Sequence, residues 1–214
     1  SQSLLSQQAL LIANAAKQTY QSISSIPASE DYFLSSAQRR LWVLNKFEGA
    51  DTAYNMPEVS FLEGKLNEDL FQKSYTSLLE RHEVLRTRFI EDTEGTPRQE
   101  ILPIEEVQTE VIIYDYRGLS NQEEVVNQQL EALNSTVFDL SSGPLIKCSL
   151  LRIGATEYVW SLVMHHIVSD GWSMGVLHRE LSTFYSAYMN NEEPTLPKLP
   201  IQYKDYAHWH NEQL

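Results

Sequence analysis

The sequence of 214 residues has little cysteine, little glycine and few basic side chains. A single cysteine, Cys148, excludes an internal disulfide framework and suits a reducing compartment. Eight glycines, with no GxGxxG or GxxxxGK run, exclude the common glycine-loop nucleotide binders. With 16 Lys and Arg against 29 Asp and Glu, the formal charge is −13, so we expect neither nucleic acid nor a membrane as a partner. The absence of a charged-then-apolar leader and of any long apolar run favours a cytoplasmic protein.

The composition predicts a folded protein with a sizeable core. Hydrophobic residues make up 42% of the chain and aromatic residues 10%, which is enough for one large domain or two small ones. Residues 1–30 differ from the rest because they combine a stretch that can form one amphipathic helix with a serine-rich run. We therefore interpret 1–30 as a linker and 31–190 as the main domain.

The elements after residue 57 alternate in type, which is typical of an α/β layered fold. Period-two and helical patterns predict the following elements. Strands are expected at 59–62, 84–90, 99–102, 107–114, 145–153 and 158–164, and helices at 37–47, 67–79, 120–133, 173–188 and within the last 14 residues. Capping boxes of Ser35 with Gln38 and of Ser120 with Glu123, and a cap at Asn67, mark three of the helix starts.

The block from His165 to Ser173, HHIVSDGWS, lies between an apolar strand and an amphipathic helix and is the main candidate site. A histidine at the end of a buried strand has little freedom, and Asp170 can fix its ring or pair with an arginine. Gly171 allows close backbone approach. The alternative reading is that His165 and His166 are core or turn residues and that Asp170 is only a helix N-cap.

Other candidate groups favour structural roles. Cys148 lies in an alternating strand with no basic partner nearby in sequence, so we expect an inert thiol. His208 and His210 form an HxH pair, but no acidic or cysteine ligand set has zinc spacing, so no metal site is expected. His82 and His178 are predicted to be structural or solvent-facing.

Five blocks in order give the chain a resemblance to a known family. The segments SSAQRRLWVL from Ser35, TAYNMP from Thr52, RHEVLRTRF from Arg81, HHIVSDGWS and YKDYAHW from Tyr203 resemble the motifs of nonribosomal peptide synthetase condensation domains. The resemblance implies a chloramphenicol-acetyltransferase-like sandwich, with a mixed sheet and helices packed on it. It covers a single N-terminal lobe of a two-lobed domain, with 191–214 as the start of the crossover to a C-terminal lobe.

Carried over residue by residue, the resemblance assigns His166 to the reaction centre. There a neutral imidazole accepts a proton from the attacking amine, or holds the amine and stabilises the tetrahedral intermediate, and the sequence leaves both roles open. His165 is interpreted as packing beside the site. Gly171 supplies close backbone approach.

The resemblance also implies that Asp170 is an orienting residue that pairs with an arginine of the RHEVLRTRF block in a buried ion pair. Its predicted partner is Arg86 first and Arg81 second, with Arg88 as a further candidate. Strand alternation from Val84 sends Arg86 and Arg88 to one face.

The resemblance implies peptide-bond formation between a donor acyl or peptidyl thioester and an acceptor aminoacyl thioester. Both substrates are carried on 4'-phosphopantetheine arms, and no other cofactor is bound directly. The expected partners are the upstream and downstream peptidyl carrier domains, the C-terminal lobe and the adenylation domain of the same module. The segments favour a donor of L configuration.

Two other functions stay open at this stage. One is a non-catalytic carrier-docking or scaffold fragment of the same fold. The other is a coenzyme A-dependent acyltransferase, which builds its site between subunits and is therefore expected to form trimers. For the condensation reading, we expect the isolated lobe to be inactive and its exposed cleft face to favour self-association.

Overall fold

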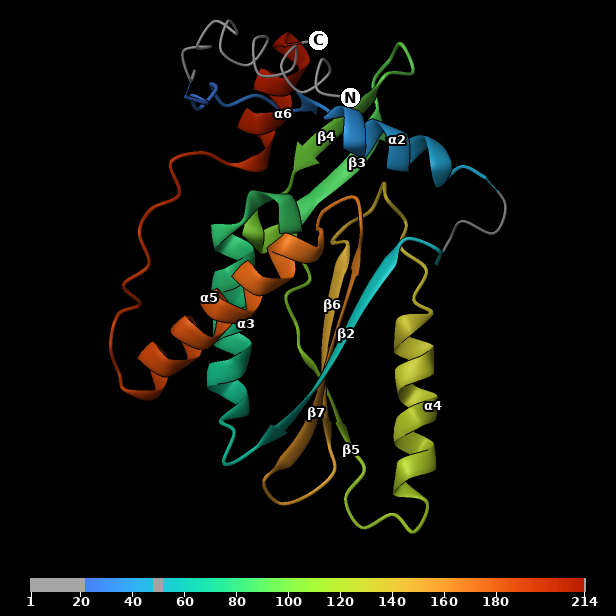
Figure 1. The fold of residues 1–214 in the computed structure, drawn as a ribbon, viewed down its shortest axis with the longest axis vertical. Helices are drawn as coiled ribbons and strands as arrows, with labels where there is room; N and C mark the ends of the chain where they lie inside the picture. The colour runs from blue at the N-terminus through green and yellow to red at the C-terminus, as the bar shows by residue number, and fades with distance from the viewer. Residues whose placement is uncertain (1–21, 48–51, 214) are drawn as a thin grey trace, which may run out of the picture.

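The computed structural model describes residues 22–47 and 52–213. Two sheets and five helices of at least nine residues make up these parts of the chain (Figure 1). The strands are β1 (Tyr32–Phe33), β2 (Asn55–Glu63), β3 (Thr87–Glu91), β4 (Pro97–Ile101), β5 (Ile112–Asp115), β6 (Ile146–Arg152) and β7 (Glu157–His165). The helices are α2 (Ser36–Leu44), α3 (Glu68–Arg81), α4 (Gln122–Asn134), α5 (Gly171–Met189) and α6 (Tyr203–Glu212), with 3-10 turns η1 (Glu83–Arg86) and η2 (Ile104–Glu106).

The larger sheet has the strand order β2-β7-β6-β5 and is mixed, because β5 runs parallel to β6 while the other pairs are antiparallel. Helices α3 and α5 cover one face and α4 covers the other (Figure 1). In β7, Leu162 and Met164 pack into the core under α3 and α5, while Val163 packs into the core on the α4 side. Burial on both faces explains why the sequence of this strand is almost continuously apolar.

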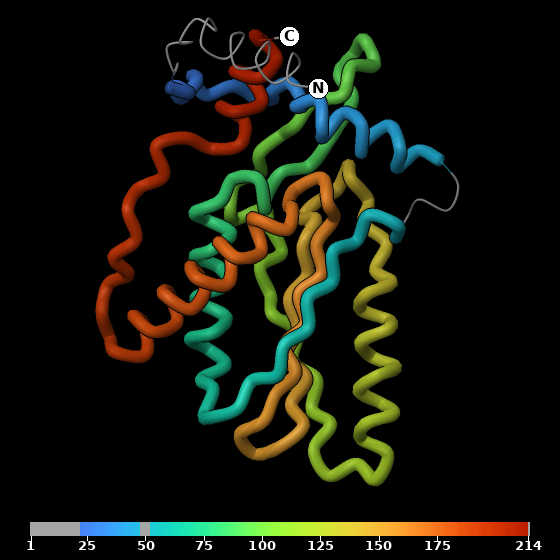
Figure 2. Tube along the Cα trace, viewed as in Figure 1, coloured from blue at the N-terminus to red at the C-terminus, as the bar shows by residue number. Residues whose placement is uncertain are grey.

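The smaller sheet, β1-β4-β3, pairs a short strand near the beginning of the described chain with the β3-β4 hairpin. Figure 2 shows the segment after residue 21 and helix α6 lying together at one end of the molecule. Ile26 N–H donates to the Asp205 carboxylate at 2.9 Å, and the Asn211 side chain donates to the Leu34 carbonyl at 2.9 Å. Helix α6 thus packs against the segment that begins the described chain.

Most of the predicted elements are confirmed, including the Ser35–Gln38 capping box and the Asn67 cap. The prediction of a capping box at Ser120 is wrong, because α4 begins at Gln122 and no side chain forms a hydrogen bond that caps its N-terminus. The strand predicted at 107–114 begins only at Ile112. Val107 and Val111 lie in the preceding loop, and their apolar side chains are buried in the core without forming a strand.

The expected strand at 84–90 begins with the 3-10 turn η1 and becomes β3 at Thr87. Its alternation is confirmed, since Leu85, Thr87 and Phe89 are buried while Arg86 and Arg88 are half-buried. The helix expected in the first 21 residues lies outside the described residues, and 22–29 form neither helix nor strand. None of the described helices combines the length and apolarity that crossing a membrane requires.

Candidate active site

The loop that joins β7 to α5 is held by backbone hydrogen bonds on both sides. His165 N–H donates to the Leu145 carbonyl at 3.0 Å, and His166 N–H donates to the Tyr54 carbonyl at 2.8 Å. A turn follows, in which Val168 N–H donates back to the His165 carbonyl at 3.1 Å. These bonds fix the two histidines at the end of a buried strand, as the sequence predicted for His166.

His165 is fully buried, with 0% exposure. Its Nδ1 accepts a hydrogen bond from Ile167 N–H at 3.1 Å, so the ring proton of the neutral form lies on Nε2. Burial, and then the neighbouring His166, lower the pKa of His165 to about 4. The ring is therefore neutral at physiological pH and packs beside the site.

His166 is exposed, and its Nδ1 has the opposite hydrogen-bonding role. Its Nδ1 lies 2.7 Å from the Ser169 carbonyl oxygen, which can only accept, so Nδ1 is the donor. The neutral ring then carries a free electron pair on Nε2, the atom that a proton acceptor needs. No described side chain forms a hydrogen bond with Nε2, which leaves it open to a ligand.

Asp170 is the N-cap of α5. One carboxylate oxygen accepts hydrogen bonds from Ser173 N–H at 2.8 Å and from the Ser173 hydroxyl at 2.7 Å. These bonds lower the pKa of the carboxyl group, and the side chain is exposed. The loop is thus secured at its far end by a capping residue.

The predicted ion pair of Asp170 is wrong. Within 22–47 and 52–213 no arginine lies within ion-pair distance of Asp170, because the three candidates have other partners. Arg81 bonds to Glu180, Arg88 bonds to Glu100 at 3.0 Å, and Arg86 donates to the Leu102 carbonyl.

Glu180, in the middle of α5, forms the buried ion pair that was expected of Asp170. Its Oε2 accepts from Arg81 Nε at 2.9 Å and contacts His82 Nε2 at 2.6 Å, and the residue is 5% exposed. Burial raises its pKa, but the bonds from His82 and Arg81 outweigh burial and the pKa is lowered. The sequence signal for the burial of Glu180 was its position three residues after Leu177, which places it on the buried face of the helix.

Gly171 is the first residue of α5, and a Cβ added there would meet no described atom within 4 Å. The described residues therefore do not themselves need glycine at this position. Cys148 is buried, accepts a bond from Trp160 Nε1 at 3.2 Å and has its pKa raised by burial to about 12, which makes its thiol unreactive. His208 pairs with Glu212 at 3.4 Å, and the described part of the chain holds no cluster of three or more metal-ligating side chains.

The chain is similar to proteins of one known family. The family model for the condensation domain matches residues 28–214. Bacitracin synthase 2 of Bacillus licheniformis is 40% identical over 203 residues, which are 94% of this chain and 7% of that protein. Malpinin synthetase of Mortierella alpina is 38% identical over 192 residues, which are 90% of this chain and 2% of that protein.

Solved structures show the same fold. The starter condensation domain of rhizomide synthetase has a TM-score of 0.77 at 21% identity, over 86% of this chain and 44% of that one. The X-domain from teicoplanin biosynthesis has a TM-score of 0.78 at 25% identity, over 90% of this chain and 40% of that one.

The fold is thus the chloramphenicol-acetyltransferase-like α/β fold of condensation domains. The chain belongs to the condensation domain family of nonribosomal peptide synthetases. It spans 40–44% of the length of these two solved relatives and 2–7% of the length of the two curated synthetases.

Proposed function

We propose that this chain is the N-terminal, histidine-bearing lobe of a domain that forms peptide bonds between two carrier-bound thioesters. The single observation that carries the proposal is the ring of His166, whose Nδ1 is bound to the Ser169 carbonyl and whose Nε2 is free. Family membership supports the same reaction.

In the proposed reaction the α-amine of the acceptor aminoacyl thioester attacks the carbonyl carbon of the donor thioester. A C–N bond forms and the C–S bond of the donor breaks. Nε2 of His166 accepts a hydrogen bond from the attacking nitrogen and can take its proton, which ends on the departing thiolate of the donor carrier. Holding the amine against the carbonyl contributes through orientation as well.

The proposal gives the domain two partner carriers, each with a 4'-phosphopantetheine arm that belongs to the substrate. The adenylation domain of the same module loads the acceptor carrier, and the reaction takes place in the cytoplasm. We further propose that residues 31–190 form the lobe proper, that 1–30 link it to an upstream carrier, and that 191–214 lead to the C-terminal lobe. Asp170 then acts as a supporting residue through its cap on α5.

Residues 1–214 alone supply one wall of the site, so we propose that they do not condense substrates without the second lobe. Trp172, beside the His166 loop, is 85% exposed, and Phe61, farther along the edge strand β2, is 57% exposed. Such exposed apolar groups favour association. We therefore expect the isolated chain to sediment as a dimer and to make no dipeptide. A strict monomer that makes dipeptide would contradict both expectations.

The direct test uses the complete two-lobed domain with loaded donor and acceptor carriers. We expect His166→Ala to lower the rate of dipeptide formation by about 10² to 10⁴. The matched control is His208→Ala, which removes an exposed histidine on α6 and leaves the rate unchanged. A His166→Ala variant that keeps the parent rate would exclude this function for the site.

A further inference from the structure

The TAYNMP segment leads into β2, and its Asn55 joins that strand to the C-terminal end of α4. The side-chain nitrogen Nδ2 of Asn55 donates to the Asn134 carbonyl at 2.9 Å and to the Thr136 carbonyl at 2.7 Å. A carbonyl oxygen can only accept, so the NH2 group must face the two oxygens and uses both of its hydrogens. Asn134 is the last residue of α4, and the last carbonyls of a helix have no partner within it. The Asn55 side chain thus gives the end of α4 donors from another element.

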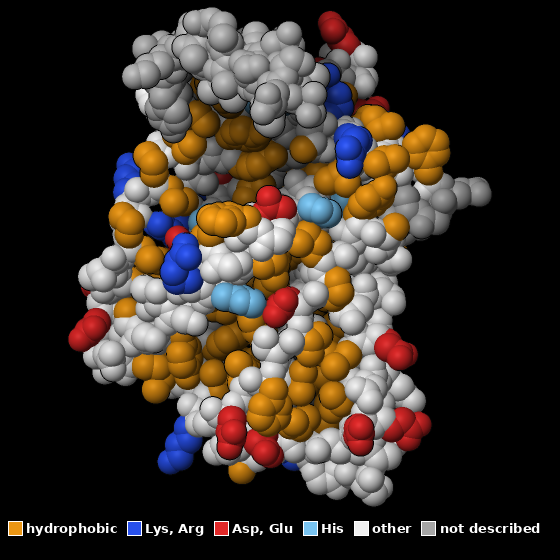
Figure 3. Space-filling model, viewed as in Figure 1, with side chains coloured by type: hydrophobic (Ala, Val, Ile, Leu, Met, Phe, Trp, Pro, Cys, Tyr) orange, Lys and Arg blue, Asp and Glu red, His pale blue; other side chains and the backbone are white. Residues whose placement is uncertain are grey.

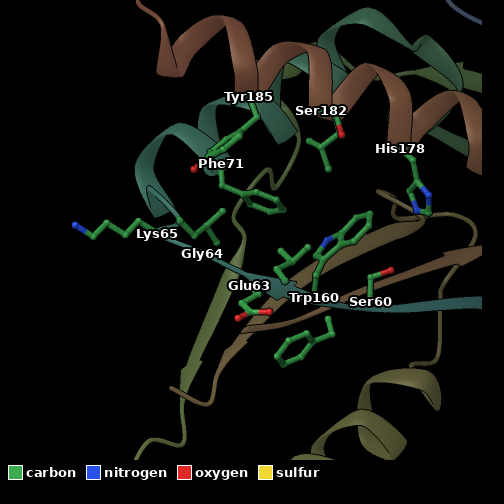
Figure 4. A pocket seen from close by; sticks show the side chains of 13 residues that line it. Ser60, Glu63, Gly64, Lys65, Phe71, Trp160, His178, Ser182 and Tyr185 are labelled. Atoms are coloured by element: carbon green, nitrogen blue, oxygen red, sulfur yellow. The ribbon is translucent and has the colours of Figure 1, made fainter. Parts of the chain in front are cut away.

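Asn55 lies on the face of the larger sheet that α4 covers. Side chains alternate along a strand, and the paired residues Ser60 and Trp160 lie on the opposite face, where they line the cavity shown in Figure 4. On the same face as Asn55, Val59 and Phe61 of β2 are 43% and 57% exposed. Figure 3 shows hydrophobic side chains along the middle of the surface that β2 crosses, between α5 and α4. Packing therefore holds β2 to α4 only weakly, and the two hydrogen bonds of Asn55 carry more of the attachment.

The start of β2 lies beside both histidines of the candidate site. In the described sheet β2 is an edge strand, paired with β7 alone. Asn55 is directly opposite His165 in this pairing, and the carbonyl of Tyr54, one residue earlier, accepts from His166 N–H at 2.8 Å. The end of an edge strand has a neighbour on one side only, so it opens more readily than a central strand. The Asn55 side chain supplies a second attachment at the residue next to the Tyr54 carbonyl.

We propose that Asn55 is a positioning residue of the reaction centre. Its amide fixes the start of β2 to the end of α4, and this holds the Tyr54 carbonyl in place for the His166 backbone N–H. With that bond intact, the His166 ring and its free Nε2 keep their place at the end of β7. Asn55 acts through Tyr54 and not by contact with a substrate, and the inference rests on the proposed function.

The first test measures backbone amide exchange by NMR in the complete two-lobed domain without substrates. We expect Asn55→Ala to speed exchange of the His166 amide by about tenfold or more, because the Tyr54 carbonyl is no longer held. The internal reference is the Gly64 amide, which donates to the Thr156 carbonyl at 2.8 Å at the opposite end of the same pair of strands. Its exchange rate should stay that of the parent.

The second test measures dipeptide formation by the same domain with loaded carriers. In Asn55→Ala we expect kcat to fall by about tenfold to a hundredfold, while KM for the acceptor carrier stays within about twofold, because the change misplaces Nε2 of His166 and leaves the binding surfaces intact. The matched control is Val126→Ala. Val126 is a buried residue of α4, so its truncation also lowers the urea midpoint but leaves the Asn55 amide bonds in place. Its kcat should stay within about twofold of the parent.

An Asn55→Ala variant with the parent's His166 amide exchange or the parent's kcat overturns the proposal. So does a Val126→Ala variant that loses as much kcat as Asn55→Ala, because a general loss of stability would then account for both. If Asn55→Ala does not fold by its urea midpoint, Asn55→Ser, which keeps one donor, takes its place under the same criteria. Since amide exchange needs no turnover, it decides whether Asn55 holds the His166 loop even where His166→Ala shows that the proposed function is wrong.

Discussion

Titratable side chains have opposite environments in the loop after β7, where they are exposed, and in the contact between α3 and α5, where they are buried. In the loop, the side chains of Asp170 and His166 are exposed and form hydrogen bonds only with residues three positions away in sequence. In the helix contact, Glu180 is 5% exposed and bonds to two groups nearly 100 residues away in sequence. The comparison separates groups that hold the lobe together from groups that remain available for chemistry.

Removing the buried carboxylate should have the largest effect on stability. Glu180→Ala leaves Arg81 and His82 without their shared partner, and we expect the free energy of unfolding to fall by about 3–5 kcal/mol. Urea denaturation of the complete domain measures this change in the free energy of unfolding. Glu131→Ala, at an exposed position of α4, serves as the control and should change stability by less than about 0.5 kcal/mol. Equal effects for the two variants would contradict the architectural role of Glu180.

Acid should weaken the fold through His165. Its pKa is about 4 in the folded chain and 6.5 when unfolded, so the unfolded state binds more protons between these values. The neutral ring contributes fully to the free energy of unfolding only above pH 6.5, and this contribution is lost as the pH falls toward 4. We expect the free energy of unfolding to decrease by about 2 kcal/mol between pH 7.5 and pH 5. The measurement is urea unfolding at both pH values.

The variant His165→Gln should reduce this pH dependence by the same amount, since glutamine does not titrate in this range. His208→Gln, at an exposed histidine, should keep the dependence of the parent. A His165→Gln variant with the full acid sensitivity of the parent would show that another group is responsible.

Removing the exposed carboxylate should have the smallest effect. Asp170→Ala deletes the cap of α5, and we expect a loss of about 1 kcal/mol, well below the effect of Glu180→Ala. Asp170→Asn keeps the cap and should cost only a few tenths of a kcal/mol. A loss of 3 kcal/mol or more in Asp170→Ala would instead indicate a buried ion pair in the complete domain.

The sequence predicted the α/β layering and the placement of His166 because both follow from short-range patterns. The apolar run of β7, the helical spacing in α5 and the capping box of α2 are local features that tertiary packing then satisfies. The motif resemblance predicted the family, and the comparisons confirm it.

The partner of Asp170 was mispredicted because ion pairing across the fold depends on which elements lie together. Arg81 is at the end of α3, and only the packing of α3 on α5 brings it to Glu180. The cavity near Trp160 likewise combines residues of β2, α3, β7 and α5 that no linear motif connects.

The hydrogen bonds of the two adjacent histidines, His165 and His166, give their neutral rings opposite tautomers, and nitrogen NMR of the labelled domain at neutral pH distinguishes the two forms. Because Nδ1 of His166 donates to the Ser169 carbonyl, we expect its proton on Nδ1 and a free Nε2. Because Nδ1 of His165 accepts from Ile167 N–H, we expect the proton of that ring on Nε2. Observing these two forms would support His166 as the proton acceptor. A proton on Nε2 of neutral His166 would contradict the account.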